Sequence, residues 1–93
     1  MSYKLVLKPE AIFDLQEAFN WYEAQKTGLG YELIGEVDSS FEKIIKHPLH
    51  YTAIKERYRR LKVNRFPYLI IFETVGNSII ILAMRHTSRR PKH

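Results

Sequence analysis

The fold is decided by residues 58–86, which read YRRLKVNRFPYLIIFETVGNSIIILAMRH. Three stretches of this segment follow the two-residue period of β-strands and are rich in β-branched and aromatic side chains. Two short connections separate the stretches, and the second, Val75-Gly76-Asn77, is typical of a hairpin turn. The segment therefore predicts three antiparallel strands, at Tyr58–Val63, Tyr68–Thr74 and Ser78–Arg85.

The preceding part of the chain predicts one strand and two helices. Tyr3–Leu7 is a short β-rich stretch, and Pro9 then suits the first turn of a helix that runs to about Lys26. A second helix follows Gly28 and ends before Pro48, because the residue before a proline avoids the helical region. The short connection predicts an antiparallel helical hairpin. The apolar positions that recur with helical spacing are Ile12, Leu15, Phe19 and Tyr22, with Ala11 and Ala18 beside them, and then Leu33, Val37, Phe41, Ile44 and Ile45.

Together these elements predict a single α+β domain over residues 1–93, in which the helical hairpin lies between the N-terminal strand and a three-stranded meander of a small twisted sheet. Two helices cover only one face of such a sheet, yet the last two strands are apolar on both faces. The surplus apolar surface predicts a protein partner, with a homodimer or coverage by residues 47–57 as the alternatives. The alternating positions are Leu69 and Ile71 against Tyr68, Ile70 and Phe72, and then Ile79, Ile81 and Ala83 against Ile80, Leu82 and Met84.

Composition excludes several classes of protein. The 93 residues contain no cysteine, which excludes disulfide scaffolds and thiolate zinc sites. The four histidines are scattered, and Gly28-Leu29-Gly30 lacks the preceding strand and third glycine of a dinucleotide site, so we expect neither a metal nor a cofactor. No apolar run is long enough to span a membrane, and the N-terminus does not resemble a signal peptide, which predicts a cytoplasmic protein with no membrane partner.

The charge is distributed unequally along the chain. Residues 1–46 hold five basic and eight acidic residues, whereas residues 47–93 hold ten basic residues and only two acidic ones, Glu56 and Glu73. This asymmetry predicts a basic face built by the second half, whose partners would be nucleic acid or an acidic protein segment. Three alternatives stay open: a merely solvated basic surface, protection of strand edges, and neutralisation by acids such as Asp14 and Glu17.

The candidate site is this set of basic residues and the rings between them. Arginine suits phosphate and carboxylate groups because its planar guanidinium donates two parallel hydrogen bonds. We assign no catalytic residue, but a metal-independent nuclease would draw on Arg60, Lys62, Arg65, Arg85 and His86. The candidates for contact with a target or an antagonist are Arg59, Arg60, Lys62, Arg65, Tyr68, Arg85, His86, Arg89 and Arg90.

The ordered set of motifs resembles the RelE/ParE toxin superfamily of type II toxin–antitoxin systems, in its ParE-like, plasmid-stabilisation form. The resemblance extends from Tyr3 to Pro91. The residues that carry it are Phe13-Asp14-Leu15, Trp21-Tyr22-Glu23, Gly28-Leu29-Gly30, Phe41 to Pro48, Arg59-Arg60, Arg65 to Phe72, Ile79 to Ala83, His86 and Arg89-Arg90-Pro91.

The resemblance implies a toxin with a cognate antitoxin, whose acidic, amphipathic segment would fold as it covers the toxin. Contact with DNA would then occur only through the antitoxin complex. The RelE-like branch cleaves mRNA on the ribosome without metal, whereas the ParE-like branch inhibits DNA gyrase. Where the nuclease branch carries an arginine after the tyrosine of its third strand, this chain has Leu69, and its tail lacks the usual terminal tyrosine. The residues therefore favour the gyrase inhibitor over the ribosome-dependent endoribonuclease, and a non-catalytic module that only completes an autorepressor is the third hypothesis.

Overall fold

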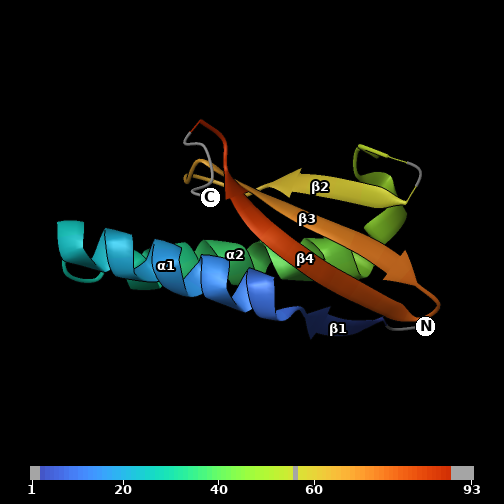
Figure 1. The fold of residues 1–93 in the computed structure, drawn as a ribbon, viewed down its shortest axis with the longest axis horizontal. Helices are drawn as coiled ribbons and strands as arrows, with labels where there is room; N and C mark the ends of the chain where they lie inside the picture. Colours follow the sequence, from blue (N-terminus) through green and yellow to red (C-terminus); the bar gives the residue numbers. More distant parts are fainter. Residues whose placement is uncertain (1–2, 56, 89–93) are drawn as a thin grey trace.

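A four-stranded sheet and a helical hairpin make up the part of the chain that the computed structural model describes, residues 3–55 and 57–88 (Figure 1). The strand order is β1-β4-β3-β2. β1 pairs in parallel with β4, whereas β3 is antiparallel to both β4 and β2. The predicted α+β fold and the antiparallel meander are thus confirmed. The strands are β1 (Lys4–Leu7), β2 (Tyr58–Lys62), β3 (Tyr68–Val75) and β4 (Ser78–His86).

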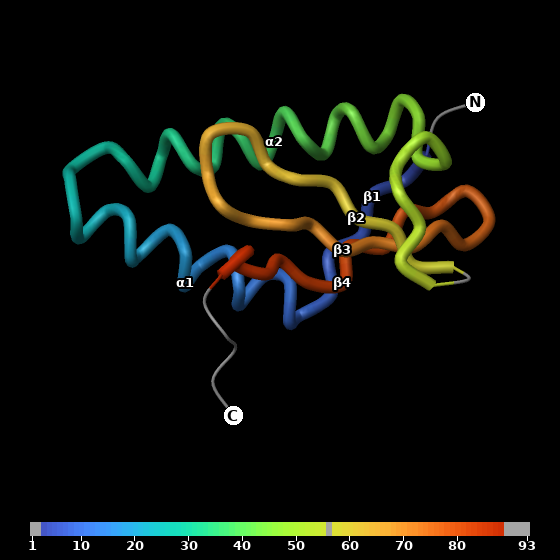
Figure 2. The backbone as a smooth tube through the Cα atoms, turned by 90° about the horizontal axis from the view of Figure 1, so that it is seen from above, coloured from blue at the N-terminus to red at the C-terminus, as the bar shows by residue number. Residues whose placement is uncertain are grey.

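The helical hairpin consists of α1 (Pro9–Gln25) and α2 (Leu29–Lys46), which Figure 2 shows side by side and joined at one end of the molecule. Pro9 occupies the first turn of α1, where a missing N–H is harmless. Gly28 precedes α2 with φ 92°, a left-handed conformation that glycine adopts without strain. Because glycine has no side chain to cap the helix, Glu23 of α1 does so, accepting hydrogen bonds from the N–H groups of Gly28 (2.8 Å) and Gly30 (2.9 Å).

The core lies between the hairpin and one face of the sheet. Its largest fully buried side chains come from both layers, and apolar burial of this kind is the main stabilising term in folding. The ring of Tyr22 in α1 packs edge-on against that of Phe66, which precedes β3, with 5.1 Å between ring centroids. The largest fully buried residues are Leu33, Val37, Ile44, Val63, Ile70, Phe72, Ile79 and Ile81.

Two predicted apolar positions of α1, Ile12 and Phe19, lie outside this core, and the half-buried Phe19 ring packs edge-on against that of Tyr31 instead. Ile12 was expected on the buried stripe of α1, but 47% of it is exposed. Ala11 and Ala18, seven residues apart, lie at 2% and 4% exposure and mark the buried side. Successive helical residues are turned by about 100°, so Ile12 faces away from that side.

A β-bulge in β4 changes which of its residues face the core, so the predicted faces of this strand are wrong beyond Ile81. Ile71 lies opposite Ala83, but the next residue of β3, Phe72, lies opposite Ile81, so Leu82 is the additional residue of β4. The predicted alternation of Ile79 and Ile81 with Ala83 therefore fails at this point. Met84, opposite the fully buried Ile70, takes the core-facing position instead.

The segment between α2 and β2 covers a strand edge. It contains the short 3-10 helix Pro48–His50 and a bridge between Ala53 and Arg59. The N–H of Ile54 donates to the carbonyl of Tyr58 at 2.8 Å, and the N–H of Arg60 to that of Thr52 at 3.1 Å. The outer edge of β2 is therefore partly protected from pairing with other chains. In the described residues no helix has the length and apolar character needed to cross a bilayer.

We predict opposite effects on stability for two alanine substitutions in α2. A Cβ at Gly30 would lie 2.8 Å from the Phe19 ring, so Gly30→Ala should lower the free energy of unfolding by about 1–3 kcal/mol through overpacking. A Cβ at Gly35 meets no atom within 4 Å, so Gly35→Ala, the matched control, should raise it by about 1 kcal/mol through helix propensity. Urea unfolding measures both. Equal effects of the two variants would contradict this description of the helix contact.

Candidate functional site

The basic residues do not gather into one free patch. β2 and β4 are separated by β3, so the arginines at their ends lie apart. One cross-strand row does connect them, since Leu69 of β3 lies opposite both Lys62 of β2 and Arg85 of β4. Side chains opposite one another in a sheet share a face. Leu69 thus lies between two cations of the candidate site.

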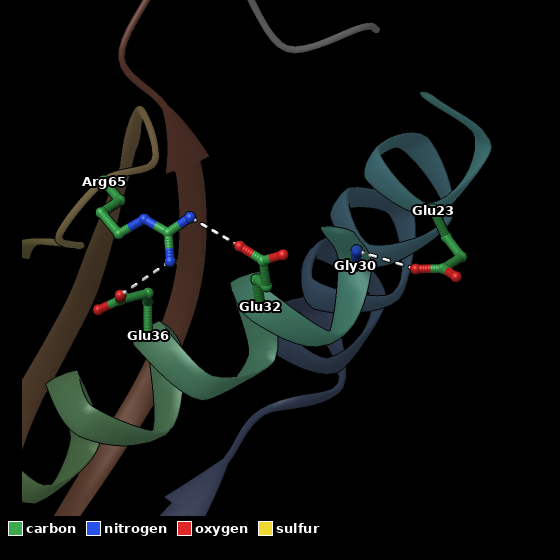
Figure 3. Close-up of polar contacts among 5 residues, drawn as sticks. All are labelled: Glu23, Gly30, Glu32, Glu36 and Arg65. Atoms are coloured by element: carbon green, nitrogen blue, oxygen red, sulfur yellow. Dashed lines mark hydrogen bonds and ion pairs between the residues drawn. The ribbon is translucent and has the colours of Figure 1, made fainter. Parts of the chain in front are cut away.

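Arg65 joins the β2–β3 loop to α2. Its Nη2 lies 2.7 Å from Oε1 of Glu32 and its Nη1 lies 3.5 Å from Oε2 of Glu36, as Figure 3 shows. The guanidinium also lies 5.4 Å from the centroid of the Phe66 ring. The hydrogen bond between Glu32 and Arg65 lowers the pKa of Glu32 and raises the pKa of Arg65. We call this contact the Arg65 bridge.

Arg85 joins the end of β4 to α1 in the same way. It pairs with Glu10 and, through Nη1 at 3.3 Å, with Oδ2 of Asp14. The same Asp14 oxygen accepts a hydrogen bond from the backbone N–H of Met84 at 3.0 Å. Burial raises the pKa of Asp14, although the Met84 N–H and Arg85 act in the opposite direction. We call this contact the Arg85 bridge.

Lys62 and Arg59 are engaged with backbone carbonyl groups. The Nζ of Lys62 donates to the carbonyls of Val63 (3.0 Å) and Phe66 (3.1 Å) in the β2–β3 loop. The Nη1 of Arg59 donates to the carbonyl of Tyr51 at 2.8 Å and so holds the segment that precedes β2. Both side chains therefore fix loops, although each keeps its positive charge.

The remaining candidates differ in their exposure. Tyr68 is only 5% exposed and packs edge-on against His86, with 5.2 Å between ring centroids. The N–H of Ser88 lies 3.1 Å from Nδ1 of His86. Arg60 is exposed on β2, and in the described residues no hydrogen bond or ion pair to its side chain is found. Arg89 and Arg90 lie outside the described residues.

The carboxylates of the two bridges are the residues that the sequence analysis missed. Of the four bridge carboxylates, the sequence analysis named only Asp14 as a neutralising acid. Glu17, which it named together with Asp14, forms no ion pair within the described ranges. A signal was present: each bridge uses two carboxylates four residues apart, Glu10 with Asp14 and Glu32 with Glu36. Residues at that spacing lie on one face of a helix.

Comparison with known proteins identifies the class. The fold is that of a small α+β toxin, in which a helical hairpin packs on a sheet. Residues 5–91 match the family described as the ParE toxin of the type II toxin–antitoxin system parDE. The chain belongs to this family. A search of curated proteins gives no match.

Two solved structures share the fold. The chromosomal ParDE TA system from P. aeruginosa has a TM-score of 0.81 at 16% identity, and the match covers 92% of this chain and 97% of that one. A double arginine-to-alanine mutant of the E. coli toxin RelE in the free state has a TM-score of 0.70 at 10% identity, over 95% of this chain and 86% of that one. At such identities the likeness establishes the fold alone.

We predict that Asp14 makes stability fall with rising pH. A carboxyl group whose pKa is higher in the folded than in the unfolded protein favours folding while it is protonated. The contribution of Asp14 to the free energy of unfolding should therefore decrease as the pH rises from about 3.8, the ordinary value, through the raised pKa of Asp14. Asp14→Asn keeps an oxygen for the Met84 N–H and should flatten this part of the profile. Urea unfolding across the acid range compares the two proteins, and parallel profiles would contradict the prediction.

We predict that the backbone of Arg65 is strained. Its φ of 70° is left-handed, a conformation in which a side chain costs about 1–2 kcal/mol that glycine avoids. Arg65→Gly and Arg65→Ala both remove the Arg65 bridge, so their difference reports the backbone alone. Arg65→Gly should be the more stable by about 1 kcal/mol in urea unfolding, after the entropic cost of glycine. A more stable alanine variant would show that the loop relaxes out of this conformation.

Proposed function

We propose that this protein is a ParE-like toxin that inhibits DNA gyrase and is neutralised by a cognate antitoxin. Its membership of the ParE toxin family supports the toxin class and points to an antitoxin partner. The structurally similar ParDE system from P. aeruginosa is a toxin–antitoxin system. The choice of gyrase over the ribosome rests on the residues of this chain.

The choice of gyrase over the ribosome rests on the partners that the basic side chains have within the protein. A metal-independent nuclease stabilises the charged phosphorane with arginine or lysine side chains that are preorganised toward the phosphate. Here Arg65 and Arg85 are each paired with two carboxylates, and Lys62 binds two carbonyl groups. Leu69 stands in the row between Lys62 and Arg85, at the position where the resemblance implies an arginine in the nuclease branch. This arrangement supports binding of a target rather than cleavage of RNA.

The fate of RNA gives a direct test against the nuclease alternative. In a translating extract, the purified protein should leave transcripts intact, because Arg65 and Arg85 are paired with carboxylates. Primer extension on a ribosome-bound message measures cleavage. Cuts that appear with the protein and are lost in the Arg60→Ala variant would contradict the gyrase proposal and favour the endoribonuclease.

Induction of the chain alone distinguishes the targets in cells. We expect growth to stop, plasmid supercoiling to fall first, and incorporation of labelled amino acids to fall later, since gyrase would be the primary target. Supercoiling by purified gyrase should likewise be inhibited by the purified protein. Early loss of translation with normal supercoiling would contradict the proposal, and normal growth throughout would favour the non-catalytic module.

A further inference from the structure

The turn that follows α2 brings two of the four histidines together. His47 is the C-terminal cap of α2, and His50 is the last residue of the 3-10 helix into which the chain then turns (Figure 2). The N–H of His50 donates to the carbonyl of His47 at 3.0 Å, which closes this turn. A 3-10 helix has three residues per turn, so side chains three residues apart are eclipsed. The two imidazoles therefore lie on the same side of the turn, with 6.1 Å between ring centroids.

Both histidines line one open groove of about 400 Å³ beside the end of α2. The groove is also lined by Tyr3, just before β1, and by Lys46 in the last turn of α2. No described carboxylate takes part in the lining. An imidazole offers a nitrogen lone pair, whereas the ammonium of Lys46 has none. The two histidines are therefore the nitrogen ligands that this groove offers to a metal ion.

We propose that His47 and His50 together bind a divalent transition-metal ion such as Zn²⁺, with water in the remaining positions. Imidazole nitrogen suits Zn²⁺, Ni²⁺ and Cu²⁺, whereas Mg²⁺ and Ca²⁺ prefer oxygen. In the described part of the chain no cluster of three or more metal-ligating side chains occurs, so water must complete the coordination, and the groove has room for it. The sequence analysis expected no metal because the histidines are scattered along the chain. The proposal does not depend on the proposed function.

The separation of the two rings fits a single ion. A Zn–N bond of about 2.0–2.1 Å places the ion about 3.2 Å from the centroid of each ligating ring. Two rings on one tetrahedral ion then have centroids about 5.2 Å apart, and about 6.4 Å is the largest separation that one ion allows. The observed 6.1 Å lies between these values. Both side chains are exposed, so the approach of about 1 Å that tetrahedral geometry needs requires only rotamer changes.

Two opposing charges act on an ion in this groove. The C-terminal end of α2 carries partial negative charge on its last carbonyl groups, which favours a cation. Lys46 carries a positive charge in the same groove and opposes one. The alternative ligand is an anion such as inorganic phosphate, which Lys46 and protonated histidines would attract. Loss of the Lys46 charge should therefore tighten the binding of a metal ion but weaken the binding of phosphate.

A bound metal would fasten the segment that protects the edge of β2. The ring of His50 packs edge-on against that of Tyr51, which in turn packs edge-on against the fully buried Phe72. The same segment exchanges backbone hydrogen bonds with β2 through the N–H groups of Ile54 and Arg60. An ion that binds only the folded turn stabilises it by mass action. Zn²⁺ should therefore raise the melting temperature and slow hydrogen exchange at these two amides.

Titration calorimetry of the full-length protein with zinc chloride tests the site, and magnesium chloride should give no binding. His47→Gln and His50→Gln should each weaken Zn²⁺ binding at least tenfold, because even the loss of a group that only orients a ligand costs about 10–100-fold. The matched control, His86→Gln, removes a histidine outside the groove and should leave the Zn²⁺ affinity unchanged. Thermal melts without metal establish that each variant folds.

Two further measurements make the outcome specific. Electron paramagnetic resonance of the Cu²⁺-loaded protein should show two imidazole nitrogens, and only one in either groove variant. Lys46→Gln should bind Zn²⁺ more tightly than the unchanged protein does. The proposal is overturned if Zn²⁺ does not bind, if His47→Gln or His50→Gln keeps the full affinity, or if His86→Gln loses it. Binding of inorganic phosphate that Lys46→Gln abolishes, with no binding of Zn²⁺, would identify an anion site instead.

Discussion

Two arginines, each held by a pair of carboxylates four residues apart on a helix, join the sheet to the helical hairpin. Arg65 ties the β2–β3 loop to α2, and Arg85 ties the end of β4 to α1. Both bridges link the sheet layer to the hairpin layer beside the apolar core that packs the two together. Exposed ion pairs contribute little to stability when isolated, so the core is the main stabilising term. The basic second half of the chain and its acidic first half thus complement each other within one molecule.

Because of this internal pairing, the positive charge does not by itself indicate a nucleic-acid binding surface. A net charge of +5 suggests a nucleic-acid binding surface, and the same residues in a free state would suit phosphate. In the folded chain most of these cations hold loops and helices in place. Among the described candidate residues, Arg60 and Lys62 lie beside an apolar sheet face and have no carboxylate partner.

The sequence predicted the order of the four strands and the two α-helices, because the hydrophobic period changes from that of helices to that of strands at Pro48, and because glycines and prolines mark the connections. It did not predict the 3-10 helix Pro48–His50. It did not predict the bulge in β4: residues 79–84 are apolar throughout, so nothing in the alternation marks Leu82 as the additional residue. The site was predicted as a set of residues but not as an arrangement. Arg65 and Glu32 are 33 residues apart, and only the three-dimensional packing of the loop on α2 brings them together.

The parallel pairing of β1 with β4 has a consequence for synthesis of the protein. β1 is the first strand to be made, yet its partner begins at Ser78, which Lys4 faces across the sheet. The nascent chain can form the hairpin of α1 and α2 early, since those contacts are local, but the sheet closes only after β4 has been translated. The Arg85 bridge, which needs both α1 and the end of β4, forms at the same late stage. A product truncated before β4 therefore lacks both the pairing of β1 and the Arg85 bridge.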